Sequence, residues 1–248
     1  MKSKRNRRGV EEGREVKKSG EKGGEVGANA ILSGSGKKWL EIGIDEAGRG
    51  PVLGSMFVAG VLNFENLANL GVKDSKKLSC WRRERLARII EAKTIVYVAE
   101  ISAEQIDKER EKGRTMNEIT LNLASEVVNF FVRKTVKPLR VFVDAADVKP
   151  ARFAERLRRA CDKGCDLEIV AEWKADERYP VVSAASIVAK VHRDRSMREI
   201  ARSIGEEIGS GYPSDPKTIA FLRNVLRSGE IPPFVRKSWK TLRRLQKH

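Results

Sequence analysis

Four acidic residues follow stretches of the chain that have the pattern of β-strands. Asp45 and Glu46 come at the end of a strand predicted over 39–44, where apolar residues alternate with small or polar ones. Asp144 closes a second run of strand-forming residues, and Asp176 comes shortly after a third. If these strands share one sheet edge, their carboxylates form a cluster of hard oxygen donors, which are the ligands that Mg²⁺ requires. An isolated Asp-Glu pair before a glycine turn is more often a solvated loop start, but the further acids weigh against that interpretation.

The turn that follows the first two acids could bring them to a ligand. Because successive strand residues point to opposite faces, Asp45 and Glu46 reach one edge together only if the strand is ending there. Gly48 and Gly50 permit such an ending and let the backbone approach a ligand closely. Arg49 would be held between them as a fixed cation.

The elements that must position these residues alternate between strands and helices along the chain. Ser79, Ser102 and Asp215 are expected N-caps, and Pro150 is expected to open a helix that ends near Cys161. This alternation predicts an α/β domain with a central mixed sheet flanked by helices. Strands are expected over 39–44, 51–62, 95–101, 139–144 and 167–171, with a long helix around 116–131 and a helix of small residues over 179–190.

Several polar residues are expected around the acids. The small-residue helix would place Ser183, Ser186 and Lys190 along one side of the acid cluster. A polar loop over 73–79 offers three lysines beside the first strand, and a glycine-rich loop over 209–214 displays one aromatic residue, Tyr212.

Composition divides the chain of 248 residues into a tail and a body. Residues 1–38 hold 11 Lys or Arg against 5 Glu, eight glycines and no aromatic residue, so we expect a disordered basic tail. The tail carries +6 of the formal charge of +16, which leaves a basic body whose partner is expected to be a polyanion. The alternative is an ion-paired surface of the thermophilic type. The body is expected to comprise an α/β domain over 39–205 and a small basic helical lobe over 206–248.

Other features limit the class of protein. No apolar run reaches membrane-spanning length, and three cysteines are too few for a disulfide framework, so a cytoplasmic protein is expected. Cys161 and Cys165 are interpreted as reduced thiols or as a disulfide of the hyperthermophile type, and not as a zinc site. His192 is interpreted as a hydrogen-bonded helix residue. Trp81, Trp173 and Trp239 are interpreted as packing residues.

Six short blocks of sequence, in order, closely resemble ribonuclease HII, and the archaeal members most of all. The resemblance covers about residues 39–245, and the basic tail lies outside the family pattern. Each block alone is a weak signal, but six in register along one chain are specific. They are Asp45-Glu46-Ala47-Gly48-Arg49-Gly50, Asp74-Ser75-Lys76-Lys77-Leu78-Ser79, Val143-Asp144-Ala145, Lys174-Ala175-Asp176, Ser183 to Lys190, and Gly211-Tyr212-Pro213-Ser214-Asp215-Pro216.

The resemblance implies an RNase H-like fold with a helical C-terminal extension. It also implies an endonuclease that hydrolyses the RNA strand of RNA/DNA hybrids and cuts 5′ of ribonucleotides embedded in duplex DNA. Asp45, Glu46, Asp144 and Asp176 would be its catalytic acids and would bind Mg²⁺ or Mn²⁺, in line with the need of phosphodiester hydrolysis for two divalent ions about 4 Å apart. The expected substrate-binding residues are Gly48, Arg49, Gly50, Lys76, Lys77, Ser186, Lys190 and Tyr212.

The expected partners follow from the same resemblance. They are RNA/DNA hybrid and ribonucleotide-containing duplex DNA, with no membrane, and the protein is expected to be a monomer. Some archaeal members end in a motif that binds the sliding clamp, but residues 238–248 show no convincing version, so no clamp partner is expected. Two alternatives stay open, a nucleic-acid-binding protein of the same fold without turnover and another RNase H-like nuclease such as a resolvase or transposase.

Overall fold

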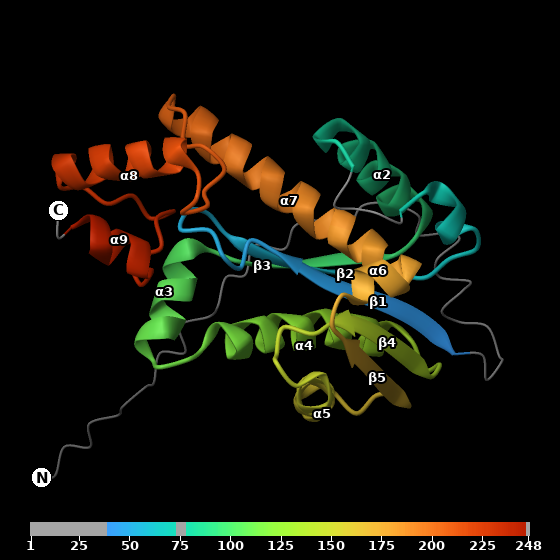
Figure 1. Cartoon of the computed structure of the whole chain (residues 1–248). Coiled ribbons are helices and arrows are strands. Elements are labelled where there is room, and N and C mark those ends of the chain that lie inside the picture. Colours follow the sequence, from blue (N-terminus) through green and yellow to red (C-terminus); the bar gives the residue numbers. More distant parts are fainter. Residues whose placement is uncertain (1–38, 73–77, 247–248) are drawn as a thin grey trace, which may run out of the picture.

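A mixed β-sheet forms the centre of the protein (Figure 1). The computed structural model describes residues 39–72 and 78–246. Within them five strands lie in the order β3-β2-β1-β4-β5, with β1 antiparallel to β2 and parallel to β4. The strands are β1 (Leu40–Ala47), β2 (Met56–Leu62), β3 (Val96–Ile101), β4 (Leu139–Asp144) and β5 (Leu167–Glu172). The expected basic tail over 1–38 and the expected phosphate contacts Lys76 and Lys77 lie outside the described residues.

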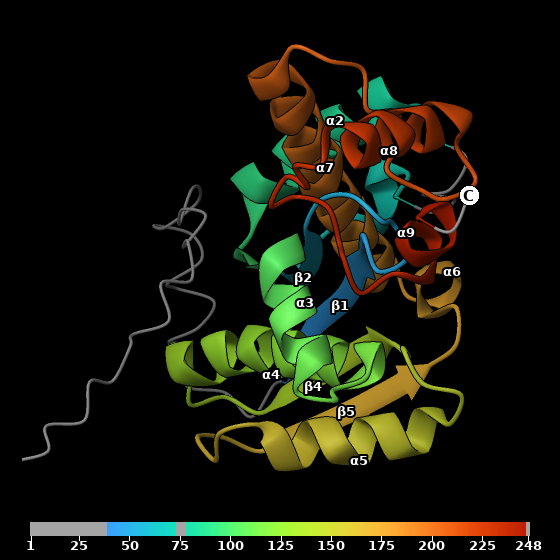
Figure 2. The same ribbon diagram turned by 90° about the vertical axis from the view of Figure 1, so that its left-hand side faces the viewer.

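Helices cover both faces of this sheet, as the alternation of elements predicted. Figure 2 shows α4 and α5 on one side and α2 and α7 on the other. The helices between the strands are α2 (Cys80–Lys93), α3 (Ala103–Glu111), α4 (Met116–Lys134) and α5 (Pro150–Ala160), and η1 (Leu67–Leu70) is a single 3₁₀ turn. After β5 come α6 (Ala175–Arg178), α7 (Pro180–Ile204), α8 (Pro216–Ser228) and α9 (Lys240–Leu245).

Two glycines allow one helix on each face to lie directly on the strands. A Cβ atom added to Gly43 of β1 would come 2.2 Å from the backbone of Val181 in α7. On the opposite face, a Cβ atom on Gly60 of β2 would come 2.4 Å from the side chain of Val127 in α4. Because α7 is so close to β1, residues one or two turns further along α7 lie against the end of that strand.

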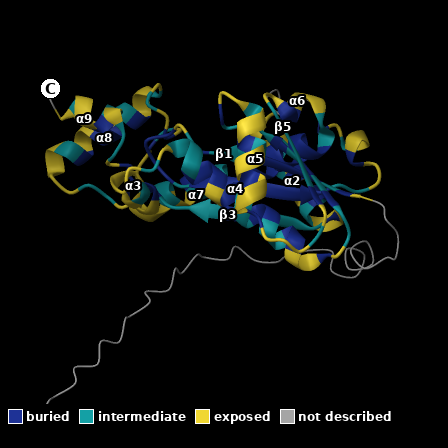
Figure 3. Cartoon of the chain, turned by 90° about the horizontal axis from the view of Figure 1, so that it is seen from below, coloured by how far each residue is buried: buried dark blue, intermediate teal, exposed yellow. Residues whose placement is uncertain are grey.

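Alternation along the strands divides the buried side chains between two cores. Ile42, Ile44, Met56 and Val58 belong to the core under α4, whereas Phe57, Ala59 and Val61 belong to the core under α2 and α7. Figure 3 shows the buried inner faces of the helices against the sheet and the exposed residues outside. This period of two is the pattern from which the strands were predicted.

The predicted helix starts are confirmed. The Ser79 hydroxyl accepts a hydrogen bond from the Arg82 amide, and Ser102 and Gln105 form a reciprocal capping box. Asp215 caps α8 by accepting from the Lys217 amide, with Pro216 as the first helical residue.

The strand predicted over 51–62 begins five residues later than expected, at Met56. Val52 and Leu53 are apolar for another reason, since both are buried in a third apolar cluster with residues of α8 and α9. Leu53 also forms an isolated bridge with Val235. The region of α8 and α9 is therefore packed against the segment that follows the first two acids.

Some of the interpretations of the tryptophans, of His192 and of the two cysteines are confirmed, and others are wrong. Trp81 and Trp173 are 70% and 60% exposed, so their interpretation as packing residues is wrong, while Trp239 is partly buried and packs against two of the cores. His192 Nε2 lies 3.1 Å from a carboxylate oxygen of Glu91, as a hydrogen-bonded helix residue should. Cys161 and Cys165 are free thiols. Along the described parts of the chain, no helix is long and apolar enough to cross a membrane.

Candidate active site

The ends of β1, β4 and β5 bring the predicted acids together. Ile44 pairs with Val143 in the last step of the β1–β4 ladder, so Asp45 and Asp144 are the next residues on neighbouring strands and point to the same face. Asp144 Oδ1 accepts a 2.9 Å hydrogen bond from the amide of Ala175. Asp176, which is buried, follows directly in the first turn of α6.

Asp45 and Glu46 are not at the end of their strand, contrary to the condition set above. β1 continues to Ala47 on its β2 side, where Glu46 pairs with Val58, and it ends at Ile44 only on its β4 side. Because the pairing with β4 ends before Asp45, the sheet edge is open at Asp45 and Glu46. The negative charges of Asp45 and Asp144 act on Glu46, so the three acids share one site.

Burial and mutual repulsion make this site unfavourable for negative charge. Burial raises the pKa of Asp45 to about 7; a hydrogen bond with Ser186 opposes the shift, and the charge of Asp144 adds to it. Burial and the charge of Asp45 raise the pKa of Glu46 to about 8, against the effect of Arg49. A cation bound between these carboxylates would remove the repulsion.

The donor set fits a hard divalent cation, because every candidate ligand is a carboxylate oxygen. In residues 39–72 and 78–246, no group of three or more His, Cys, Asp or Glu side chains is arranged to hold a metal ion.

Helix α7 supplies the side of the site that faces Asp45. Ser186 is fully buried, and Lys190 Nζ donates to its hydroxyl at 2.6 Å. The positive charge of Lys190 also acts on Asp45. Ser183 was expected beside the acids as well; its hydroxyl donates to the carbonyl of Val72.

The Gly48–Gly50 turn forms the next part of the site. Gly48 has a φ of 87°, and a Cβ atom there would come 2.6 Å from the carbonyl oxygen of Ser55, so this position requires glycine. Arg49 donates to the carbonyl of Ala146 at 3.0 Å and to the side chain of Asn117. Its guanidinium also lies 3.9 Å from Glu46. The arginine is thus a fixed cation, as predicted.

Sequence reasoning missed Arg236, which holds this turn from behind. Its buried guanidinium donates to the carbonyls of Gly48 at 2.6 Å, Arg49 at 3.1 Å and Gly54 at 2.9 Å. Burial lowers the pKa of Arg236 to about 9. Trp239 Nε1 donates to the carbonyl of Gly50 at 3.1 Å, so Arg236 and Trp239 together contact all three residues of the turn.

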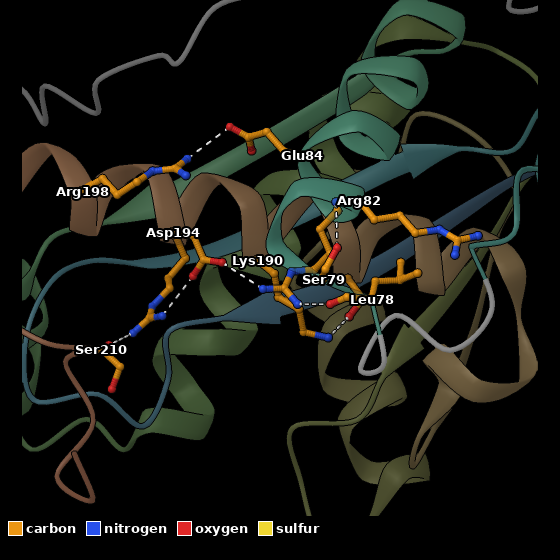
Figure 4. Close-up of polar contacts among 11 residues, drawn as sticks. Leu78, Ser79, Arg82, Glu84, Lys190, Asp194, Arg198 and Ser210 are labelled. Atoms are coloured by element: carbon orange, nitrogen blue, oxygen red, sulfur yellow. Dashed lines mark hydrogen bonds and ion pairs between the residues drawn. The ribbon is translucent and has the colours of Figure 1, made fainter. Parts of the chain in front are cut away.

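A cleft of about 430 Å³ opens beside the acids. The Tyr212 ring, 39% exposed, lies across it, with Cε1 3.6 Å from the place of a Cβ atom on Gly50. The guanidinium of Arg193 lies 5.0 Å from the centre of that ring. Figure 4 shows polar contacts of Lys190 and Asp194, two of the residues that line the cleft. The lining includes Glu46, the Gly48–Gly50 turn, Lys190 and Tyr212, together with Arg83, Arg193 and Asp194, which were not predicted.

Comparison with known proteins identifies the family. The model of the ribonuclease HII family matches residues 42–242. The chain belongs to the ribonuclease HII family. Its members cleave the RNA strand of RNA/DNA hybrids. The ribonuclease HII of Methanothrix thermoacetophila is 48% identical over 213 residues, which cover 84% of this chain and 97% of that protein.

Solved structures share the fold of this chain, which confirms the RNase H-like prediction. The ribonuclease HII in the PCNA:RNase HII complex from Archaeoglobus fulgidus superposes with a TM-score of 0.75 at 42% identity, over 84% of this chain and 97% of that one. The structure of Bst-RNase HIII in complex with Mn²⁺ has a TM-score of 0.73 at 21% identity, over 88% of this chain and 72% of that one, and shows likeness of fold alone.

The expectation of no sliding-clamp partner is contradicted by this comparison, because the Archaeoglobus fulgidus enzyme was solved in complex with PCNA. That expectation came from a search for a linear motif over 238–248.

Proposed function

We propose that the protein is a metal-dependent endoribonuclease in which Asp45, Glu46, Asp144 and Asp176 hold two divalent cations, Mg²⁺ or Mn²⁺. When bound, the two ions would activate a water molecule and neutralise the attacked phosphate. The observation that carries the proposal is the cluster of Asp45, which is buried, with Glu46 and Asp144, which are partly buried, where Glu46 lines a cleft with several cationic side chains. A protein that only bound nucleic acid would gain nothing from carboxylates that face phosphate.

The Gly48–Gly50 turn is proposed to read the 2′-hydroxyl of the ribonucleotide, which is the group that distinguishes RNA from DNA. Its carbonyl oxygens are held by Arg236 and Trp239, so the turn keeps one conformation as the sugar approaches. Tyr212 would pack against the following sugar, where an added hydroxyl would not fit. One ribonucleotide within duplex DNA should then suffice as a substrate.

The phosphate contacts are proposed from charge and position. Lys190 and the unpredicted Arg83 and Arg193 line the cleft. Ser186 is buried, so its hydroxyl would act through Lys190 and Asp45. Lys76 and Lys77 are proposed as further phosphate contacts on the basis of the family motif alone.

The test is to sequence the ends produced from a DNA duplex that contains one ribonucleotide, with and without Mg²⁺. Cleavage is expected 5′ of the ribonucleotide: water would attack the phosphorus, the P–O3′ bond would break and the 3′-oxygen would leave, which gives a 3′-OH upstream and a 5′-phosphate on the ribonucleotide. The matched control carries 2′-H in place of that 2′-OH and should be cut far less. A 2′,3′-cyclic phosphate, or equal cutting of the all-DNA control, would overturn the mechanism. Binding without cleavage in Mg²⁺ or Mn²⁺ would favour the non-catalytic alternative.

The Archaeoglobus fulgidus complex supports a further proposal, that a PCNA-type clamp is a partner of this protein. Co-elution of the two purified proteins in gel filtration is the expected result. Separate elution at micromolar concentration of each would contradict it.

A further inference from the structure

Asp194 joins two arginines that line the cleft. Its carboxylate accepts from Arg83 at 3.3 Å and from Arg193 at 3.0 Å (Figure 4). Arg83 belongs to α2, whereas Arg193 and Asp194 are neighbours on α7. Asp194 therefore fixes the position of one helix relative to the other at the cleft.

Each arginine holds a different loop at the cleft. Arg193 donates to the carbonyl of Ser210 and lies over the ring of Tyr212, so it fixes the loop that carries the tyrosine. Arg83 donates at 2.7 Å to the carbonyl of Leu78, at the end of the loop before α2. Through these contacts the carboxylate of Asp194 links the loop that carries Tyr212 to the end of the loop before α2.

The charge of Asp194 is unexpected at this place. A carboxylate that lines a cleft for nucleic acid repels phosphate, and an uncharged residue would favour affinity. Without the carboxylate, the guanidinium groups of Arg83 and Arg193 would repel each other. Arg193 would then lose a contact that orients it over Tyr212.

We propose that Asp194 is a positioning residue for substrate selectivity, which holds Arg193 so that Tyr212 stays beside Gly50. The inference rests on the proposed function, in which Tyr212 favours a deoxyribose after the ribonucleotide. Asp194 lowers the affinity for nucleic acid and, through Arg193, keeps the Tyr212 ring in one position. Its loss therefore lowers the preference for a single ribonucleotide and does not weaken binding.

Glu84 provides a matched control on the same pair of helices. It accepts from Arg195 and from Arg198, each at 3.1 Å, and so also joins α2 to α7 through two arginines; Figure 4 shows the contact with Arg198. The Glu84 and Asp194 side chains are similarly exposed, at 20% and 24%. Glu84 is not among the residues that line the cleft.

The experiment compares Asp194→Asn, Tyr212→Ala, the double variant and Glu84→Gln in the full-length protein. The readout is the ratio of kcat/KM on a single-ribonucleotide duplex to that on an all-RNA/DNA hybrid, with Kd from fluorescence anisotropy in EDTA. Asp194→Asn is expected to lower the ratio about tenfold through kcat, which corresponds to one contact in the transition state. Its Kd should be unchanged or tighter.

The control and the double variant separate positioning from general destabilisation. Glu84→Gln should change the ratio less than about twofold, and the double variant should match Tyr212→Ala, because coupled residues are not additive. An unchanged ratio in Asp194→Asn, with a lowered ratio in Tyr212→Ala, would overturn the inference and leave the proposed function standing. An unchanged ratio in Tyr212→Ala would refute the role of the tyrosine and the inference together.

Discussion

Replacement of Arg236 by methionine is expected to destabilise the protein and impair cleavage. The change keeps a long side chain of similar shape and removes all the donors that hold the turn. Three carbonyl oxygens, those of Gly48, Arg49 and Gly54, then lose hydrogen bonds from a buried cation. The turn beside the acids would be free to move.

The magnitude follows from these three contacts. An unsatisfied buried acceptor costs about 1–3 kcal/mol, which gives an upper limit of about 9 kcal/mol for three. Water from the cleft can reach part of the turn, and methionine avoids the cost of burying a charge. The expected loss in free energy of unfolding is therefore about 3–5 kcal/mol, similar to the loss of one partner of a buried charge pair. The stability of Arg236→Lys should lie between that of the original protein and that of Arg236→Met, because an ammonium group lacks the planar fork of donors of a guanidinium.

Urea denaturation measures the loss as a lower midpoint at constant m-value. Arg243→Met, an exposed arginine of α9, is the matched control and should stay within about 0.5 kcal/mol of the original protein. Cleavage of the folded Arg236→Met fraction should fall at least about tenfold. Stability of Arg236→Met equal to that of the control would refute the argument that this guanidinium holds the turn.

Three further expectations concern the acids and the sheet. Asp144→Asn should abolish cleavage but leave hybrid binding intact or tighter, as measured by single-turnover assay and anisotropy; normal turnover would remove Asp144 from the metal site. The pKa values of Asp45 and Glu46 are raised to about 7 and 8 in the folded protein, so the folded state holds protons that the unfolded state releases. In EDTA the contribution of these two acids to stability should be full below about pH 4 and decline as pH rises through 7 to 8. Asp45→Asn should flatten a melting profile over this range, and a profile unchanged by the substitution would contradict the shift. Gly43→Ala would force a methyl group to within 2.2 Å of the backbone of Val181 and should cost about 3 kcal/mol in urea denaturation, whereas a neutral effect would show that α7 can move away.

Local physics made much of the fold predictable from the sequence. Ser79, Ser102 and Asp215 cap helices through contacts with residues two or three positions away, so their types and spacing suffice. The placement of Asp144 at a strand end also follows from a local pattern. The grouping of the acids needed one further assumption, that the strands share an edge, and the parallel β1–β4 register confirms it.

Contacts between distant residues were not predictable. Val52 and Leu53 have a strand-like pattern, but their apolar character serves the cluster around α8 and α9. Arg236 lies in a basic segment, and a fully buried arginine that bonds three carbonyls runs against the usual exposure of arginine. Asp194 stands in a run of alternating charges that is typical of a solvated helix face.

The contacts of Arg236 also have a consequence for how the protein folds. This side chain bonds the carbonyl of Gly48 across 188 positions of sequence and that of Gly54 across 182. Loops of this length are slow to close, because chain entropy opposes them until the contact forms. During synthesis the sheet and α7 can assemble first, but the turn gains its support only after residue 236 has left the ribosome. Assembly of a competent site is thus a late event in folding, and nascent chains that lack this residue should be inactive even when their sheet is formed.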